Sequence, residues 1–227
     1  MIVLSHEMKR YFKETYGRES IYVRNGVSIP SGAEADLIAR EFGLHKQEYI
    51  LYLGRLVPEK GIHYLLEAFR DVKTEKKLVI AGNIDKTEYV SMICREAEKD
   101  SRVIMTNFVQ GRMLEELFSN CFLYVLPSEV EGMAISLLEA MSYGAHCLLS
   151  DIDENKEAAE DHADYFANGD VKMLRKKLQE LVDADAAYDV EGQKQFVAAR
   201  YDWKKINSET LDIYQRAIQK KTVRKKR

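Results

Sequence analysis

One stretch of the sequence decides the fold: Tyr49-Ile50-Leu51-Tyr52-Leu53-Gly54-Arg55-Leu56-Val57-Pro58-Glu59-Lys60-Gly61. Its first five residues form a short apolar run, which is typical of a fully buried strand. Gly54 follows directly, where the carboxyl end of a strand has to turn. Beyond Gly61, the residues His63–Arg70 place apolar side chains on one face of a helix. A strand, a turn and then a helix is the repeating unit of a parallel sheet covered by helices.

The same alternation continues along the chain and predicts an α/β fold. We expect a Rossmann-like parallel sheet of about six strands with helices on both faces, followed by C-terminal helices. The expected strands are Ile21–Arg24, Tyr49–Leu53, Leu78–Ala81, Val103–Thr106, Leu123–Leu126 and His146–Leu149. The expected helices are His63–Arg70, Tyr89–Lys99, Leu114–Phe118, Ile135–Tyr143, Asp153–Glu160, Asp170–Val182, a stretch near Glu191–Arg200, and Trp203–Lys220. We therefore divide the chain into an interdomain remnant (1–20), a Rossmann-like domain (21–200), and a closing helix with a basic tail (201–227).

Composition excludes several classes of protein. The 227 residues carry a formal net charge of −3, and nothing in that balance favours nucleic acid as a partner. The three cysteines are scattered and the five histidines form no ligand cluster, so we expect free thiols in a reducing compartment and no metal site. The first residues resemble neither a signal peptide nor a membrane span. The sequence predicts a cytoplasmic protein.

Two cations follow the first quoted strand and predict a phosphate site. Arg55 and Lys60 lie five positions apart, between Gly54 and the start of a helix. Charge and free helix amides would both point to a bound diphosphate there. The alternative is a solvated loop in which these cations pair with Glu59 or Glu67.

A second informative stretch follows the strand Leu123–Leu126. Glu131 stands just before a predicted helix and Glu139 lies eight residues on, about 12 Å along the axis. This span suits a ligand with a hydroxylated ring at each end and a diphosphate between them, bound by backbone amides of Gly132, Met133, Ala134 and Ile135. The alternative is that Glu131 only stabilises the helix N-terminus and Glu139 is a surface residue.

These motifs resemble those of a known family. Gly54-Arg55-Leu56-Val57-Pro58-Glu59-Lys60-Gly61, with Pro127-Ser128-Glu129-Val130-Glu131-Gly132 and Leu138-Glu139-Ala140-Met141, is similar to the retaining glycosyltransferases of family 4 (glycosyl transferases group 1). These enzymes have the GT-B fold, which consists of two Rossmann-like lobes. The resemblance runs from Val23 to about Tyr214 and identifies the chain as the C-terminal, donor-binding lobe.

The resemblance implies roles for the marked residues. Arg55 and Lys60 would hold the diphosphate of a nucleotide-sugar donor, Glu131 the transferred sugar, and Glu139 the ribose. The base would pack near Asn83, Phe108 and Val109. Glu131, Arg55 and Lys60 would carry the catalytic contribution of this lobe to a hexosyl transfer with retention, without a metal. The family usually has a glycine pair where this chain has Ile152-Asp153-Glu154-Asn155. The loop that faces the sugar is therefore less open and more acidic, and the identity of the sugar stays open, as does that of the base.

The resemblance also implies a missing partner. The family has an N-terminal domain that binds a glycan or lipid-linked acceptor, and we expect this chain to be inactive without it. A non-catalytic nucleotide-sugar-binding or regulatory module, and an epimerase or phosphorylase of the same fold, remain alternatives. The basic tail from Lys220 could contact anionic lipid at the inner face of a membrane, or could be a frayed helix end.

Overall fold

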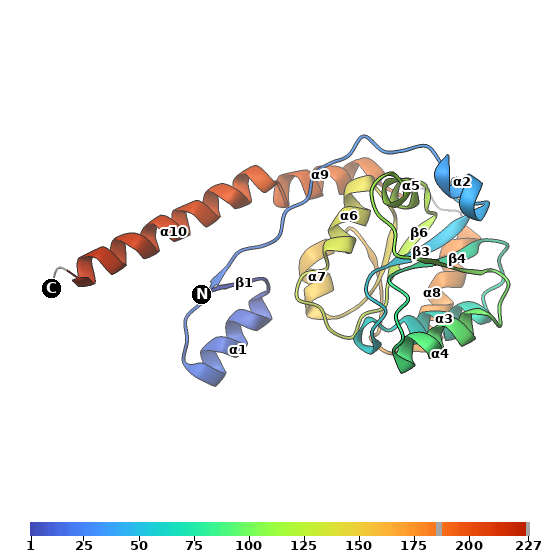
Figure 1. The fold of residues 1–227 in the computed structure, drawn as a ribbon, viewed down its shortest axis with the longest axis horizontal. Helices are drawn as coiled ribbons and strands as arrows, with labels where there is room; N and C mark the ends of the chain where they lie inside the picture. Colours follow the sequence, from blue (N-terminus) through green and yellow to red (C-terminus); the bar gives the residue numbers. More distant parts are fainter. Residues whose placement is uncertain (185–187, 226–227) are drawn as a thin grey trace.

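The computed structural model describes residues 1–184 and 188–225, with side chains described as far as residue 219 (Figure 1). The side chains of the basic tail from Lys220 lie outside the described residues. Within them, a six-stranded sheet is covered on both faces by helices, which confirms the expected Rossmann-like fold.

All strands of the main sheet run parallel, in the order β5-β4-β3-β6-β7-β8. The central strands are buried along almost their whole length, because helices cover both faces, and this explains their continuous apolar sequence. The bounds are β3 Tyr49–Leu53, β4 Lys77–Ala81, β5 Val103–Asn107, β6 Leu123–Leu126, β7 Cys147–Ser150 and β8 Asp164–Phe166.

The chain winds outward from the middle of this sheet in two directions. From β3 it moves to β4 and β5, then returns to β6 and moves to β7 and β8. The strand order therefore reverses between β3 and β6. In an open parallel sheet, ligands bind beside the carboxyl ends of the strands at such a switch point.

The helices form one layer on each face. One layer packs α3 (Ile62–Arg70) against α4 (Glu88–Ala97) and α8 (Val171–Ala184). The other packs α6 (Ile135–Tyr143) against α5 (Arg112–Asn120) and α9 (Val190–Arg200), with α2 (Leu37–Phe42) beside α5. Helix α7 (Asp153–Ala159) links β7 to β8.

One strand prediction was wrong, and one strand of the main sheet was missed. The predicted strand at Ile21–Arg24 forms only β2 (Ile21–Tyr22), which pairs with β1 (Ile2–Val3) in a separate two-stranded sheet. The sixth strand of the main sheet is instead β8, which the sequence analysis did not predict. This strand is only three residues long and begins on an aspartate, so no apolar run marks it in the sequence. The Asp164 carboxylate lies 2.7 Å from Nε2 of His146.

The first residues also contain structure that the sequence analysis missed. Helix α1 (His6–Tyr16) connects β1 to β2, and the Ser5 hydroxyl caps it by accepting a hydrogen bond from the Met8 amide. This small β1-α1-β2 unit spans the boundary that we placed at residue 20.

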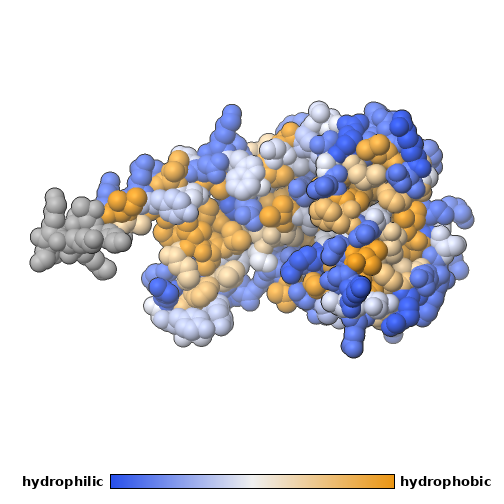
Figure 2. Space-filling model, in the orientation of Figure 1, coloured by the Kyte–Doolittle hydropathy of each residue, from blue (hydrophilic) through white to orange (hydrophobic). Residues whose placement is uncertain are grey.

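Helix α10 (Trp203–Lys225) extends away from the sheet, at the same end of the molecule as the β1-α1-β2 unit (Figure 1). Its apolar residues Trp203, Leu211 and Tyr214 are between 43% and 58% exposed. Figure 2 shows apolar side chains gathered beneath α10 and around the β1-α1-β2 unit. This end of the molecule thus has less core than the main sheet.

Candidate functional site

The candidate site lies at the carboxyl ends of β3 and β6, where the strand order reverses. A loop from Gly54 to Lys60 follows β3, and a loop from Pro127 to Ala134 follows β6. A cavity of about 490 Å³ lies between them. Its lining includes eight of the residues predicted to bind a donor: Gly54, Arg55, Lys60, Glu131, Gly132, Met133, Ala134 and Ile135.

Gly61 brings the two loops together. Its φ of +65° is a left-handed conformation that favours glycine, and it ends the short 3-10 helix η1 (Pro58–Lys60). A Cβ on Gly61 would also lie 2.0 Å from the carbonyl oxygen of Pro127. The close approach of the two backbones therefore requires a glycine, and it places Lys60 beside the β6 loop.

Lys60 and Glu131 form a buried ion pair at the centre of the site. The Lys60 Nζ lies 2.5 Å from the Glu131 Oε1, and the two side chains are only 13% and 5% exposed. Neither of the alternative partners of Lys60, Glu59 or Glu67, is used. The pair is therefore largely removed from solvent.

A chain of hydrogen bonds fixes the Glu131 carboxylate from the other side. The Ser128 hydroxyl donates to the Glu131 Oε1 over 2.7 Å, and the Ser150 hydroxyl donates to the Ser128 carbonyl oxygen. The Asn155 amide then donates to the Ser150 carbonyl and hydroxyl oxygens, each over 3.0 Å. All four side chains belong to buried residues. The orientation of Glu131 is thus set by three separate segments of the chain.

Arg55 differs sharply from Lys60. Its side chain is 74% exposed, and its guanidinium reaches Glu59 only at 3.9 Å. An exposed pair at this distance contributes little to stability. The Arg55 side chain is therefore available to a ligand in the cavity.

Helix α6 presents its N-terminus to the same cavity. Its N-cap residue, Ala134, offers no side-chain oxygen to the first amides. Ile135, the first helical residue, is 53% exposed. Uncapped amides and the positive end of the helix dipole favour an anion at this position.

Glu139 lies on α6 one to two turns beyond this N-terminus. Its side chain is half-buried, and no side-chain hydrogen bond or ion pair of Glu139 occurs among the described residues. Burial raises the pKa of its carboxyl above the usual value. Glu139 is not part of the cavity lining, although it lies on the helix that closes it.

The residues predicted to lie near the base are also outside the cavity lining. Asn83 and Phe108 follow β4 and β5, and both are exposed, Phe108 by 63%. Phe108 is thus not part of the hydrophobic core. Val109 is half-buried against the core. The structure brings these three residues to neighbouring strand ends, on the far side of β3 from Glu131.

The sequence analysis missed the wall that faces Arg55 and Lys60. A second cavity, of about 400 Å³, is lined by both cations and also by Glu7, Tyr11 and Glu154. Burial, a hydrogen bond to Glu7 and the charge of Glu7 raise the pKa of Glu154 to about 7. The signal available in the sequence was Ser5 followed by an acidic residue and apolar positions at helical spacing, which marks a capped amphipathic helix.

Residues 1–184 and 188–225 contain neither a candidate membrane span nor a cluster of metal-ligand side chains. No helix there is both long and apolar enough to cross a bilayer. No three histidine, cysteine, aspartate or glutamate side chains in this part of the chain come together as metal ligands would.

Comparison with known proteins links this geometry to a family. The family model described as glycosyl transferases group 1 matches residues 35–203. An uncharacterized glycosyltransferase of Methanocaldococcus jannaschii is 30% identical over 192 residues, covering 79% of this chain and 48% of the relative. The serotype-specific mannosyltransferase WbdA of Escherichia coli is 28% identical over 181 residues, covering 76% of this chain and 22% of WbdA. The chain thus spans half or less of these relatives.

Solved structures share the fold at low sequence identity. A glycosyltransferase of Rickettsia africae matches with a TM-score of 0.86 and 14% identity, over 96% of this chain and 63% of that one. HepE of Anabaena, crystallised with UDP and glucose, matches with a TM-score of 0.84 and 18% identity, over 94% of this chain and 62% of that one. The expectation of one lobe of a GT-B fold is confirmed. With its family model matched over most of the sheet domain, the chain belongs to the glycosyl transferases group 1.

Proposed function

We propose that this chain binds the nucleotide-sugar donor of a retaining glycosyltransferase that transfers a hexose to a glycan or lipid-linked acceptor. One observation carries the proposal. The buried Lys60–Glu131 pair, the exposed Arg55 and the uncapped N-terminus of α6 all border one cavity at the switch point of the sheet. This combination offers cations and amides for a diphosphate beside a carboxylate for sugar hydroxyls.

The diphosphate binds between Arg55, Lys60 and the amides that follow Gly132. Lys60 has three N–H donors, so it can keep its bond to Glu131 while donating to a phosphate oxygen. Cleavage of the sugar–phosphate bond leaves more negative charge on the diphosphate. Donors already aimed at this position lower the barrier without reorganising.

The two carboxylates hold the two rings of the donor. Glu131 is held in place by Lys60 and Ser128 and accepts hydrogen bonds from the hexose. Glu139 has no side-chain partner among the described residues and accepts hydrogen bonds from the ribose. The base extends toward Asn83, Phe108 and Val109, where the exposed Phe108 ring offers a stacking surface.

The relatives support this class of donor. HepE of Anabaena has been crystallised with UDP-glucose, and WbdA of Escherichia coli is named as a mannosyltransferase. We therefore propose UDP-glucose and GDP-mannose as the first donors to test.

We further propose that transfer requires a second lobe. The chain spans 48% of the Methanocaldococcus relative, and a domain of typical size would fill the remainder. The acceptor hydroxyl must be held about 3 Å from the anomeric carbon in a site that excludes water. In this chain the β1-α1-β2 unit contributes to the cavity that both cations line, and none of the residues of its helix is buried.

A calorimetric titration with UDP-glucose, GDP-mannose and ADP-glucose tests the proposal. We expect one of the three to bind with saturation at a single site, while donor hydrolysis stays slow and transfer is absent. Adding the second lobe should restore transfer. Absence of binding for all three donors would reject the proposal.

The same titration separates the alternatives. A regulatory module would bind the donor but stay inactive after the second lobe is added. A phosphorylase would bind inorganic phosphate and a sugar phosphate in place of the intact donor, and an epimerase would convert the sugar without an acceptor.

A further inference from the structure

A third cavity, of about 710 Å³, lies at the opposite end of the sheet from the candidate site. Its lining includes Gln47, Phe122 and His146, which come just before β3, β6 and β7 respectively. It therefore opens at the amino ends of the three strands whose carboxyl ends carry Gly54, Pro127 and Ser150. Its volume is within the range of small-molecule sites. None of the residues assigned to donor binding lines it.

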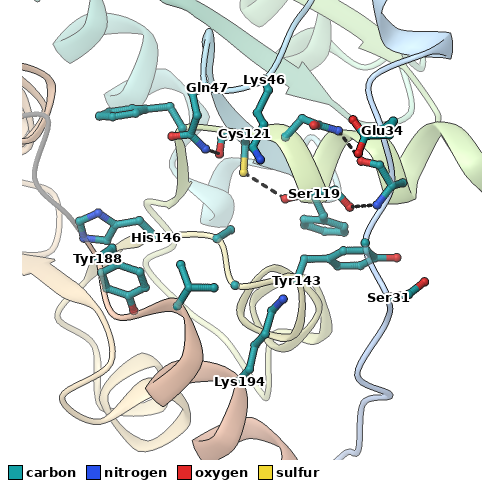
Figure 3. Close-up of a pocket in the computed structure, with 18 of the residues that line it drawn as sticks. Ser31, Glu34, Lys46, Gln47, Ser119, Cys121, Tyr143, His146, Tyr188 and Lys194 are labelled. Carbon is teal, nitrogen blue, oxygen red and sulfur yellow. Dashed lines mark hydrogen bonds between the residues drawn. The ribbon is translucent and has the colours of Figure 1, made fainter.

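Two lysines point into this cavity from facing sides. In Figure 3 the side chain of Lys46 descends from one wall and that of Lys194 rises from the helix opposite, with their ammonium groups directed into the hollow. Neither lysine forms an ion pair or a side-chain hydrogen bond with another described residue. Lys46 is exposed and Lys194 is half-buried, so both ammonium groups are free to bind an anion in the cavity.

The remaining charges leave this cavity positive. Among the described lining residues the other cation is Arg112, which donates to the Glu116 Oε1 over 3.0 Å. Glu116 is fully buried, so Arg112 is held by a fixed partner. The lining carboxylate is Glu34, which is exposed. Among the described lining residues, the two unpaired cations Lys46 and Lys194 therefore outnumber the one carboxylate, Glu34.

The backbone holds Lys194 in this position. Gly144, which ends α6, has a φ of +81°. A Cβ at Gly144 would lie 2.9 Å from the Lys194 Cε. The lysine stem therefore packs directly on the backbone of Gly144, and Lys194 lines the cavity.

Ring surfaces and polar groups complete the lining. The Tyr143 ring stacks on Phe118 at 5.6 Å, and the His146 ring stacks on Tyr188 at 4.1 Å. In Figure 3 Tyr143 lies to one side of the hollow, and His146 with Tyr188 to the other. Ser31 adds a hydroxyl to the lining. Paired cations, ring faces and a hydroxyl together match a small ring compound that carries a phosphate group.

We infer that this cavity is a second ligand site, separate from the donor site, which binds a small organic phosphate between Lys46 and Lys194. The phosphate lies between the two ammonium groups, and the ring of the ligand packs on Tyr143.

Titration with glucose 6-phosphate and with inorganic phosphate, followed by amide NMR, tests the inference. The protein is the full chain carrying Arg55→Ala, which weakens phosphate binding at the other end of the sheet. We expect saturable shifts at Gln47, Gly144 and Ala145, and no saturable shift at Gly132. Glucose 6-phosphate should bind more tightly than inorganic phosphate, because only the former offers a ring.

Two double variants supply the comparison. Lys46→Ala with Lys194→Ala should weaken binding at least about tenfold, since each removes a charge-assisted contact. Lys86→Ala with Lys204→Ala removes the same charge from exposed positions outside the cavity and should change the affinity less than twofold. If the cavity double variant unfolds, Lys46→Gln and Lys194→Gln are measured singly. Equal losses in the two double variants, or no saturable shift at Gly144, would overturn the inference.

Discussion

The two ends of the parallel sheet hold their positive charge in different ways. At the carboxyl end, Lys60 is buried against Glu131, whose carboxylate is fixed in turn by a chain of serine and asparagine side chains. At the amino end, Lys46 and Lys194 have no ion-pair partner among the described residues. A cation that is buried and paired is part of the fold, whereas a cation that only faces a cavity contributes little to stability. Removal of a lysine should therefore lower the free energy of unfolding strongly at the carboxyl end and only slightly at the amino end.

Removal of Lys60 should have the largest effect. Lys60→Ala leaves the buried Glu131 carboxylate without its partner, and we expect a loss of about 3 kcal/mol in the free energy of unfolding. Lys46→Ala is the matched control at the other end and should change it by less than about 0.5 kcal/mol. Urea unfolding of both variants measures the difference, and equal losses would erase the contrast between the two ends.

Arg55 tests whether an exposed cation contributes to ligand affinity without contributing to the free energy of unfolding. Arg55→Ala should weaken binding of a nucleoside diphosphate by roughly 1.5–3 kcal/mol, because a charge-assisted hydrogen bond is lost. Its unfolding free energy should stay within about 0.5 kcal/mol of the wild type, since the side chain is 74% exposed. Calorimetric titration with UDP and GDP measures the first quantity. Unchanged affinity for both nucleotides would place the diphosphate elsewhere.

The two carboxylates on either side of the α6 N-terminus should differ in what they recognise. Glu139→Ala should weaken binding of the free nucleotide and of the nucleotide sugar alike, by about 1–2 kcal/mol, because the ribose is common to both. Glu131→Gln should penalise the nucleotide sugar while largely sparing the free nucleotide. The glutamine retains a side-chain oxygen for Ser128, so it is a milder change than alanine. Identical affinity profiles for the two variants would contradict the assignment of the two rings.

The smallest expected effect concerns Glu154, whose pKa is raised to about 7 by burial and by Glu7. The folded state then holds this proton more tightly than the unfolded state, whose carboxyl has a pKa near 4.5. Between these two values the folded state binds more protons, so stability falls as the pH rises from about 4.5 to 7.

Glu154→Gln should remove that decline. We expect the variant to be more stable than the wild type at pH 8 by roughly 1 kcal/mol, since solvent screens a part-exposed pair. Thermal unfolding between pH 5 and pH 8 measures it. Glu7→Gln should have the same sign, and a parallel pH profile in the wild type and both variants would show that the two carboxyls do not interact.

Most of the fold was predictable because most of its strands and helices have a clear pattern of apolar residues in the local sequence. Four buried strands are continuous apolar runs, and the helix Ile135–Tyr143 was predicted with its observed bounds. The failures lie where local signals are weak. The strand β8 is short and begins on an aspartate, while Ile21–Tyr22 has the composition of a strand but pairs outside the main sheet.

The sequence predicted which residues form the candidate site better than it predicted their contacts and burial. Arg55, Lys60 and Glu131 were marked by their spacing, and the structure places all three on one cavity. Helix α1 was missed although its Ser5 cap and its apolar positions at helical spacing mark it locally. The Glu7–Glu154 contact was missed with it, and this contact joins segments far apart in the sequence, which local signals do not reveal.

The sequence by itself determined that strands end at Gly54 and Pro127, that helices follow them, and that cations and carboxylates stand at those ends. These properties depend on neighbours within a few residues. Only the tertiary structure decided that Lys60 is bound to Glu131, 71 residues away, and that Lys46 and Lys194 face one cavity. The close approach of Gly61 to Pro127 sets the first, and the packing of Lys194 on Gly144 contributes to the second. Whether a charged side chain is held in an ion pair or stays available to a ligand depends on its burial. Burial arises only when distant segments of the chain pack together.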